Sequence, residues 1–325
     1  MGDRDMHGYD IIGDVHGCAT KLEALLTELG YQPDAANGAY AHPHRTVIFV
    51  GDLIDRGPEQ LRVLEVAKTM TDAGTAQVVM GNHEFNAIAY ATESLPGSGN
   101  YLRPHNRKND HQHQEFLEQV IGAQRAHYVD WFMSLPLWLD LGGLRIVHAC
   151  WHGESIDTAQ DELGGNRFTS ADQLVRATTK DQPLYEAVEV LLKGPEISLT
   201  DHGQPEYRDK DGHLRERARV RWWSDTASTL REIAQMEGNF TTVDGTPYPP
   251  LADIAAPAIS RSYVYDGPVP TFFGHYWRDG TPEHLVDWTA QTACLDFSAV
   301  KGGPLTAYRW SGERELRAEN FVQRV

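Results

Sequence analysis

The sequence has few cysteines and no long apolar segment. Its three cysteines are widely spaced among 325 residues and form no Cys-x-x-Cys pair: Cys18, Cys150 and Cys294. We therefore expect neither a disulfide framework nor a cysteine-rich zinc site, and the thiols fit a reducing cytoplasm. No apolar run approaches the length of about 18 residues that indicates a membrane helix. The charged N-terminal stretch lacks the apolar segment of a secretory signal.

Basic residues are also scarce. The chain has 29 Lys and Arg against 46 Asp and Glu, a formal net charge of −17. This acidity argues against stable nucleic-acid binding, which requires a basic face. The hydrophobic fraction of 41% and the charged fraction of 23% are typical of a soluble globular protein. We expect a single domain over residues 1–325, with no membrane partner.

A strand–loop–helix pattern occurs three times in the N-terminal part, which predicts an α/β fold. The first helix has Leu22, Leu25, Leu26 and Leu29 at helical spacing, and Gly30 follows as a C-terminal stop. The predicted strands are Tyr9–Ile12, Thr46–Val50 and Gln77–Met80, and the helices are Cys18–Gly30, Pro58–Ala73 and Glu84–Glu93.

The C-terminal part reads as short strands that would form a second, antiparallel or mixed sheet. These strands are Gly143–Ala149, Pro270–Gly274, His284–Asp287, Ala293–Phe297 and Leu305–Trp310. Two segments, residues 95–140 and 153–268, interrupt this plan. They have predicted helices over Phe116–Phe132, Leu184–Lys193 and Thr226–Met236. We expect both insertions to cap one end of the core.

Metal-binding side chains follow five of the predicted strands. Asp14, His16, Asp52, Asn82, His148 and His275 all lie in such positions, most of them next to a glycine. Loops at the carboxyl ends of strands are where α/β sheets place their ligand sites. The sequence therefore predicts that these six side chains converge.

The residue types suit a pair of divalent cations. Asp14 and His16 are two positions apart, so in an extended chain both point to one side and can hold one ion. Asp52 has two carboxylate oxygens and can bridge two ions, and Asn82, His148 and His275 would complete the second. Mixed imidazole and oxygen ligands favour manganese, with iron, zinc, cobalt or nickel as alternatives.

Three further residues adjoin the predicted ligands. Arg56 can hold phosphate oxygens through two parallel hydrogen bonds. His83 can serve as general acid toward a leaving group, and Asp55 can hold its imidazole in the required tautomer. The combination predicts metal-assisted phosphoester hydrolysis.

The motifs GDVHG (13–17), GDLIDRG (51–57), GNHE (81–84) and GHYW (274–277), with His148 between the last two, occur in a recognisable order. They resemble the phosphoprotein-phosphatase branch of the calcineurin-like metallophosphoesterases, which includes bacterial Ser/Thr protein phosphatases and symmetrical dinucleoside-tetraphosphate hydrolases. The stretch GGPLTAYRW (302–310) resembles the closing strand of the bacterial members. The resemblance covers residues 9–95, 143–150 and 270–311.

The resemblance implies two mixed β-sheets packed as a sandwich and flanked by helices. It implies direct attack of a metal-bound hydroxide on a phosphomonoester or phosphoprotein, with the ligand and catalytic roles given above. His148 is followed by Ala149-Cys150-Trp151 where protein phosphatases typically have Gly-Gly, which weakens the phosphoprotein interpretation. The alternatives are a symmetrical bis(5′-nucleosyl)-tetraphosphate hydrolase and a non-catalytic, metal-binding regulatory protein. Intact His83 and Arg56 oppose the second alternative.

The substrate pocket is less defined by the sequence. Arg56 and Asn82 are expected to contact phosphate, and Tyr276 to lie in the pocket beside a ligand. The family usually has a second phosphate-binding arginine, for which Arg219, Arg221 and Arg261 are candidates. Seven other histidines lie in polar stretches and are expected to face solvent: His42, His44, His105, His111, His113, His202 and His213.

Overall fold

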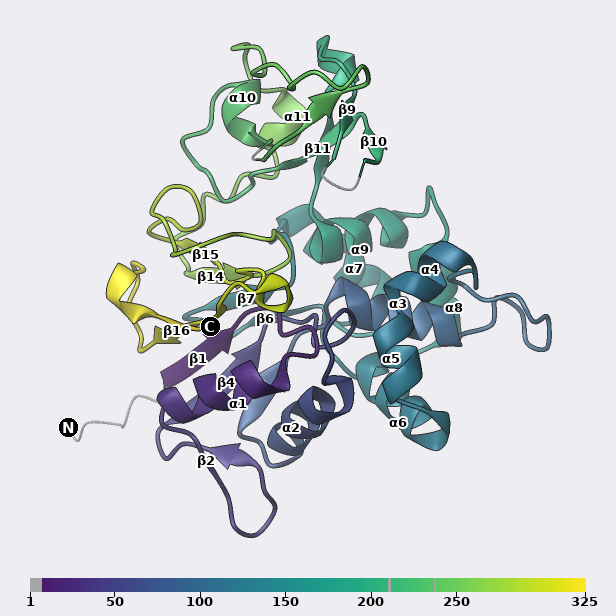
Figure 1. Ribbon diagram of the computed structural model, residues 1–325, viewed down its shortest axis with the longest axis vertical. Helices are drawn as coiled ribbons and strands as arrows, with labels where there is room; N and C mark the ends of the chain where they lie inside the picture. Colours follow the sequence, from purple (N-terminus) through teal and green to yellow (C-terminus); the bar gives the residue numbers. More distant parts are fainter. Residues whose placement is uncertain (1–7, 210–211, 237) are drawn as a thin grey trace.

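Two mixed β-sheets form the centre of the computed structural model, which describes residues 8–209, 212–236 and 238–325 (Figure 1). The first sheet has the strand order β17-β16-β1-β4-β5 and the second β15-β14-β7-β6. The first comprises β1 (Gly8–Ile12), β4 (Arg45–Phe49), β5 (Ala76–Val78), β16 (Leu305–Trp310) and β17 (Phe321–Arg324). The second comprises β6 (Trp138–Asp140), β7 (Arg145–Val147), β14 (Thr271–Phe273) and β15 (Thr292–Cys294). The expected pair of sheets is confirmed.

The two sheets share a buried apolar layer. In the first sheet, Ile11 of β1 pairs with Ile48 of β4 on one side and with Tyr308 of β16 on the other. These side chains belong to one buried cluster with Ile146 and Phe272 of the second sheet. Each fully buried side chain of this kind contributes about 1.5–3 kcal/mol, so this layer holds the sheets face to face.

Helices cover the other face of the first sheet. Because side chains alternate along a strand, Val47 and Phe49 of β4 point away from Ile48 and pack with Leu22 and Leu64. These leucines belong to α1 (Ala19–Glu28) and α2 (Gln60–Asp72), which lie along the sheet in Figure 1. As the sequence predicts, α1 stops before Gly30, which has a φ of +91°.

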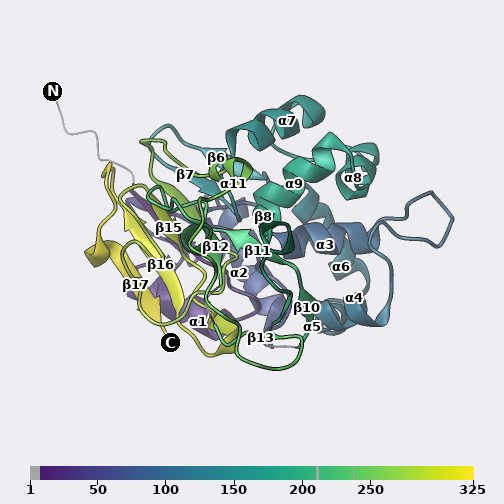
Figure 2. The ribbon, with the colours of Figure 1, turned by 90° about the horizontal axis from the view of Figure 1, so that it is seen from above.

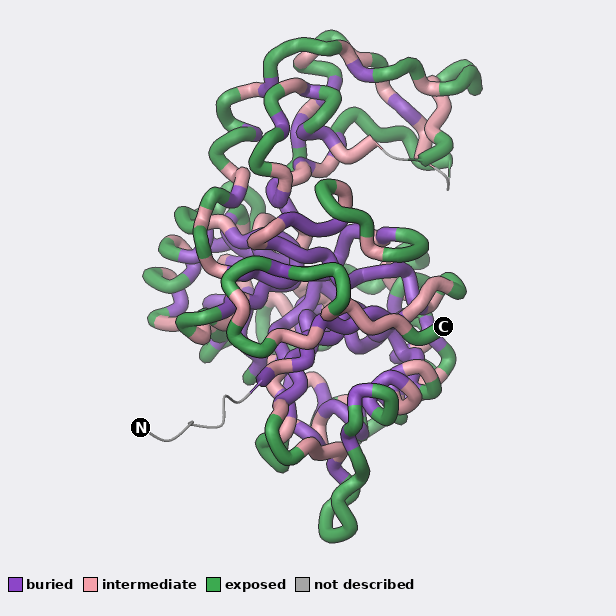
Figure 3. Tube along the Cα trace, turned by 90° about the vertical axis from the view of Figure 1, so that its left-hand side faces the viewer, coloured by how far each residue is buried: buried purple, intermediate pink, exposed green. Residues whose placement is uncertain are grey.

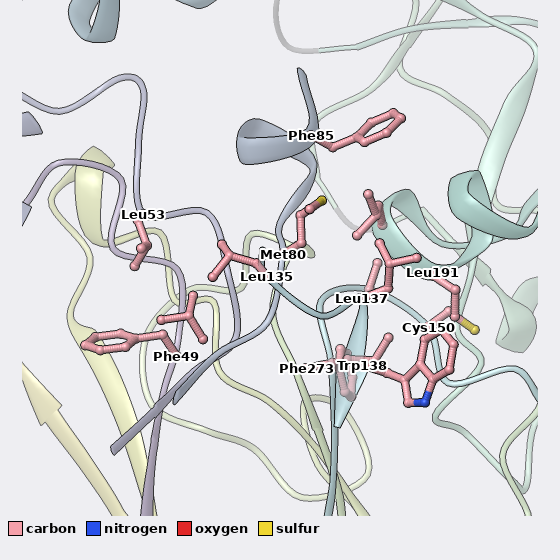
Figure 4. Packing of buried hydrophobic residues seen from close by; sticks show 14 of the residues in the cluster. Phe49, Leu53, Met80, Phe85, Leu135, Leu137, Trp138, Cys150, Leu191 and Phe273 are labelled. Atoms are coloured by element: carbon pink, nitrogen blue, oxygen red, sulfur yellow. The ribbon is translucent and has the colours of Figure 1, made fainter. Parts of the chain in front are cut away.

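The same core extends into the helices of the two insertions. Figure 4 shows Phe49 and Leu53 on one side and Phe273, Cys150 and Leu191 on the other, all in one cluster. The helices that contribute to it are α5 (Gln114–Gln119), α6 (Gly122–Met133), α7 (Gly153–Leu163), α8 (Ala171–Thr178) and α9 (Pro183–Lys193), together with α3 (Asn82–Ala91) before the first insertion. The remaining inserted helix of the first segment, α4 (Arg107–Gln112), has no buried residue. The other inserted helices are thus packed on the body and fixed in position.

The described residues between 196 and 265 (196–209, 212–236 and 238–265) form an outer part at one end of the molecule, at the top of Figure 1. It contains small sheets with the orders β12-β11-β8 and β10-β9-β13. Its elements are β8 (Glu196–Ser198), β9 (Tyr207–Arg208), β10 (Leu214–Arg215), β11 (Arg217–Val220), α10 (Leu230–Ile233), β12 (Ala234–Gln235), β13 (Thr241–Thr242) and α11 (Ala258–Arg261). Figure 2 looks down on this part, and Figure 3 shows that much of its chain is exposed.

One strand assignment and one sheet assignment made from the sequence are wrong. Residues 284–287 form a turn, in which Leu285 has a φ of +67° and the Asp287 carboxylate accepts the backbone N–H of Glu283. Leu305–Trp310 is a strand, but it pairs antiparallel with β1 in the first sheet. The second sheet therefore ends at β15 and is smaller than expected.

Two helix assignments also need correction. The helix expected over Thr226–Met236 is reduced to the single turn α10, because Ala234 and Gln235 pair with β11 as β12. The helix expected over Phe116–Phe132 is divided into α5 and α6, and Gly122, the first residue of α6, has a φ of +55°. The helix expected over Leu184–Lys193 is confirmed as α9.

Candidate metal centre

The six predicted ligands meet around the carboxylate of Asp52. Its Oδ2 lies 3.5 Å from Nε2 of His16 and 3.4 Å from Nε2 of His148. Potential ligand atoms of Asp52, His148 and His275 lie within 4.8 Å of one another. The structure thus brings together side chains that follow β4, β7 and β14, while their role as ligands stays a prediction.

Asn82 and Asp14 complete the group. Oδ1 of Asn82, the first residue of α3, lies 3.1 Å from Nε2 of His148. Oδ2 of Asp14 accepts the backbone N–H of His275 at 3.1 Å, which ties the loop after β1 to the loop after β14. All six residues follow the carboxyl ends of strands, where this fold class places its ligand sites.

Glycines leave room for the carboxylates. A Cβ atom on Gly274 would lie 1.9 Å from Oδ1 of Asp14, and one on Gly81 would lie 2.3 Å from Oδ1 of Asp52. Both distances are far below van der Waals contact, so any larger residue would displace a predicted ligand. This close approach explains why glycine precedes the functional residue in these motifs.

Three buried ligand atoms have no hydrogen-bond partner in the described part of the chain. They are Oδ1 of Asp14, Nε2 of His16 and Nε2 of His275. An unsatisfied buried polar atom costs about 1–3 kcal/mol, and several of them in one place need an explanation. Bound divalent cations would supply the missing partners, so the residues present fit a metal centre.

Backbone carbonyls orient two of the imidazoles. Nδ1 of His16 lies 2.7 Å from the carbonyl oxygen of Ile54, and Nδ1 of His148 lies 2.9 Å from that of Val50. A carbonyl can only accept, so Nδ1–H donates in both rings. Nε2 of each ring is thereby directed toward Asp52, the arrangement that metal-binding histidines require.

The charges at the centre depend on burial. Burial lowers the pKa of the His16 imidazole to about 3, against the attraction of Asp52. Burial and the nearby Arg219 lower the pKa of His275, so both rings are neutral and able to bind a cation. Burial would also lower the pKa of His148, but the Asp52 carboxylate raises it to about 10. A cation at this position would replace that proton.

His83 lies beside the centre and is held by two charged residues. Its Nδ1 is 2.5 Å from Oδ2 of Asp55, and its Nε2 is 3.3 Å from Nη2 of Arg56. Burial would lower the pKa of His83, but the carboxylates of Asp52 and Asp55 raise it. The Arg56 guanidinium stacks on Trp277, 4.2 Å from the ring centre. The pairing expected from the sequence is therefore present.

His113 is not exposed, contrary to the sequence-based expectation. Only 4% of it is accessible, and its Nδ1 lies 2.6 Å from Oδ1 of Asp55. Its ring stacks on Phe116 at 4.8 Å. Burial alone would raise the pKa of Asp55, but hydrogen bonds from His113 and His83 hold it at about 2. The first insertion thus contributes a buried contact to the site.

A cavity of about 340 Å³ opens above these residues. Its lining includes Arg56 and Asn82, the first two predicted phosphate contacts. Tyr276 is buried beside His275 and lines an adjoining cavity of about 650 Å³.

The other two predicted phosphate contacts lie elsewhere. Arg221 lines a separate cavity of about 240 Å³, and Arg261 is exposed on α11, so neither borders the 340 Å³ pocket. Arg219, the third arginine considered, does line it. Arg219 lies within β11, whereas Arg221 follows the end of that strand, where its backbone carbonyl accepts the N–H of Ser224 in a turn.

None of the helices in residues 8–209, 212–236 and 238–325 has the length and apolar character needed to cross a membrane. The three cysteines are free and buried.

Known proteins resemble the chain over different shares of its length. Bis(5′-nucleosyl)-tetraphosphatase, symmetrical, of Pectobacterium carotovorum subsp. carotovorum is 24% identical over 309 residues, which cover 94% of this chain and 92% of that protein. The asymmetrical bis(5′-nucleosyl)-tetraphosphatase PrpE of Oceanobacillus iheyensis is 47% identical over 75 residues, only 23% of this chain and 29% of that protein. The chain thus matches less than a third of the length of this curated relative.

A protein serine/threonine phosphatase from Saccharomyces cerevisiae, similar to human phosphatase PP5, has a related structure. The TM-score is 0.51 at 14% identity, and the match covers 99% of this chain and 80% of that one. At this identity the likeness concerns the fold. Residues 9–275 match the family model described as Calcineurin-like phosphoesterase. The chain therefore belongs to the calcineurin-like phosphoesterases, a family of metal-dependent hydrolases, as its motifs predict.

Proposed function

We propose that the chain hydrolyses phosphomonoesters at a pair of divalent cations. Asp14, His16 and Asp52 would hold one cation, and Asp52, Asn82, His148 and His275 the other. The observation that supports this most is the group of unpartnered buried atoms on Asp14, His16 and His275 around the Asp52 carboxylate. Manganese suits this ligand set, and iron, zinc, cobalt and nickel are alternatives.

The remaining residues would bind the phosphoryl group and move a proton. When bound, the two cations would activate a water molecule and neutralise charge on the phosphoryl oxygens. Arg56 and Asn82 would hold those oxygens from the pocket wall. His83 would donate a proton to the leaving oxygen through Nε2, while Asp55 accepts its Nδ1–H and fixes the ring.

We propose further that residues 95–140 and 153–268 are caps of one metallophosphoesterase domain. Support comes from the pocket lining, to which the first segment contributes Arg103 and His113 and the second Lys193 and Arg219. Three buried free thiols support a reducing, cytoplasmic location.

Hydrolysis of a dinucleoside tetraphosphate is the second candidate. The end-to-end match with the symmetrical hydrolase of Pectobacterium carotovorum subsp. carotovorum favours it. A non-catalytic, metal-binding role is opposed by the intact pair of Arg56 and His83.

Chelation provides the test. The protein is stripped with a chelator and assayed on p-nitrophenyl phosphate before and after addition of Mn²⁺, Fe²⁺, Zn²⁺ or Mg²⁺. We expect activity to disappear on stripping and to return with at least one cation, and full activity after complete chelation would contradict the proposal. A panel with a phosphopeptide, a mononucleotide and diadenosine tetraphosphate then separates the two candidate substrates.

The role of His83 has its own test. His83→Asn should retain bound metal and lose rate by about 10²–10⁴-fold on alkyl phosphates, with a smaller loss on p-nitrophenyl phosphate, whose leaving group needs no proton. His111→Asn, an exposed histidine on α4, is the control. An equal loss on both substrates would exclude the proton-donor role.

A further inference from the structure

Five basic side chains from the two insertions surround the predicted metal centre. Arg103 and Lys108 come from the first insertion, and Lys193, Arg215 and Arg219 from the second. All five side chains line one pocket. Lys108 lies on α4, Lys193 on α9 and Arg215 on β10, three elements that can be followed in Figures 1 and 2. In a chain with a net charge of −17, this concentration of positive charge at one pocket indicates an anionic ligand.

Two of these arginines bond only to neutral groups among the contacts that the structure describes. Arg103 donates to Oδ1 of Asn86 at 2.6 Å and to Oε1 of Gln112 at 2.8 Å. Arg219 donates to the backbone carbonyl of His275 at 3.4 Å. Neutral acceptors orient a guanidinium without cancelling its charge, so both arginines are positioned for an anion.

Lys193 and Arg215, two more of the five basic side chains, are held less tightly, each in an ion pair. Lys193 pairs with Glu189 one turn earlier on α9, and Arg215 pairs with Asp209 at 2.9 Å. Partly exposed ion pairs of this kind are weak, so a ligand with higher charge density can take over the cation. Among the described residues of the two insertions, Glu196 supplies the carboxylate that lines the pocket. Nε of Arg217 lies 3.4 Å from Oε2 of Glu196.

A single phosphoryl group does not need these five cations. The two metal ions that we propose around Asp52, together with Arg56 and Asn82, would already contact each oxygen of that group. A cavity of about 340 Å³ is at the lower end of the range for pockets that hold organic ligands, larger than one phosphate group requires. The insertion cations therefore need further anionic groups on the same substrate.

We propose that Arg103, Lys108, Lys193, Arg215 and Arg219 form a subsite for an oligophosphate chain that continues from the phosphate being cleaved. This inference rests on the proposed hydrolase function and favours its second candidate, because the bond that is cleaved would then be a phosphoanhydride and not a simple phosphomonoester. In the reaction, water adds its hydroxyl to the attacked phosphorus and releases its other proton, and the bridging P–O bond breaks. The bridging oxygen leaves with a proton from His83, which takes up a proton from solvent to return to its starting state. The products are two shorter phosphates.

The adjoining cavity of about 650 Å³ distinguishes two sources of such a chain. Its lining shares Arg215, Arg219 and Trp277 with the pocket at the predicted metal centre, and it also includes the aromatic residues Tyr207 and Phe240. Free polyphosphate would occupy only the basic subsite. A nucleoside polyphosphate would also place its base against these aromatic rings.

Calorimetry on the metal-stripped full chain tests the subsite without turnover. The ligands are inorganic phosphate, pyrophosphate, tripolyphosphate and ATP. We expect the dissociation constant to fall at least about tenfold from phosphate to tripolyphosphate, because each added phosphate meets further charged donors. ATP binding as tightly as tripolyphosphate assigns the ligand to the phosphate chain alone, and tighter binding adds the nucleoside.

Variants separate this charge effect from general ones. The double variant Arg103→Gln/Arg219→Gln should weaken tripolyphosphate binding about tenfold or more, and Arg103→Lys/Arg219→Lys should restore most of it. Arg107→Gln, which removes the same charge from an exposed position next to Lys108 outside the pocket, should change binding less than about twofold.

Equal dissociation constants for phosphate and tripolyphosphate would overturn the subsite, as would an equal loss in Arg107→Gln. Hydrolysis of p-nitrophenyl phosphate by the metal-loaded wild type is measured separately. An active enzyme with no preference for longer phosphates contradicts the subsite alone. A protein that binds longer phosphates more tightly but hydrolyses no p-nitrophenyl phosphate with any added metal ion contradicts the proposed function alone.

Discussion

Replacement of His113 by phenylalanine isolates one hydrogen bond in a buried network. Phenylalanine preserves the ring that stacks on Phe116 at 4.8 Å and faces Tyr90 at 5.4 Å. It removes the Nδ1–H donor that lies 2.6 Å from Oδ1 of Asp55. Oδ1 of Asp55 would then lose this donor, while Oδ2 still accepts a hydrogen bond from His83.

The cost follows from the burial of Asp55, of which only 2% is exposed. A hydrogen bond to a charged group contributes about 1.5–3 kcal/mol, so we expect His113→Phe to lower the unfolding free energy by about 2 kcal/mol at pH 7. The hydrogen bonds hold the pKa of Asp55 at about 2, below its unfolded value of about 3.9. Their contribution is therefore present above pH 4 and disappears as the pH falls toward 2.

Urea unfolding of the metal-free protein at pH 7 and pH 3 measures this effect, and the difference between wild type and variant should shrink at the lower pH. His113→Asn is the matched variant, because its amide nitrogen occupies the place of Nδ1 and should restore much of the stability. With metal, His113→Phe should also lose about tenfold in kcat on alkyl phosphates, a barrier change of about 1.4 kcal/mol. Unchanged unfolding at pH 7 would refute the reasoning.

Three other changes test the centre and the core. Asp52→Asn should remove bound metal and activity together, by elemental analysis and p-nitrophenyl phosphate assay; an active variant with two bound cations would contradict the bridging role. Gly274→Ala places a Cβ atom 1.9 Å from Oδ1 of Asp14 and should weaken metal binding, whereas Gly165→Ala, with open space around it, should not. Trp222→Phe loses a buried Nε1–H bond of 2.8 Å to a backbone carbonyl and part of a packed ring. It should cost about 1–3 kcal/mol in urea unfolding, and a cost near zero would count against that bond.

The sequence predicts the six ligand positions because each depends on local features. Asp14 and Asp52 each follow a short apolar strand and a glycine, and the parallel strands β1 and β4 bring their ends to one edge of the sheet. The two sheets and most helices could be predicted for the same reason, since periodicity reports local structure. The turn at 284–287 could not, because Leu285 adopts a positive φ that no apolar pattern reveals.

His113 shows where such reasoning ends. It lies in a polar stretch with His111 two residues before it, and nothing in that stretch distinguishes the buried ring from the exposed one. Only the packing of α4 and α5 on the body turns His113 toward Asp55, a contact across 58 residues. Arg219 and Arg221 pose the same problem, because both belong to one strand-like pattern and nothing in it shows that β11 ends between them.

Some functional residues can be predicted from the sequence and others cannot, for a physical reason that also concerns substrate specificity. The proposed reaction centre lies at strand ends, where a glycine and a carboxylate at fixed spacing are enough to set the geometry. The insertions need only place a positive charge at the pocket wall. Many different sequences can do this, because either Arg or Lys supplies the charge and its position along the chain can vary. Arg103 and Arg219 therefore carry no motif, although their charges face the same cavity as Arg56. It follows that substrate choice should change with substitutions in the insertions, while metal content depends on the strand ends.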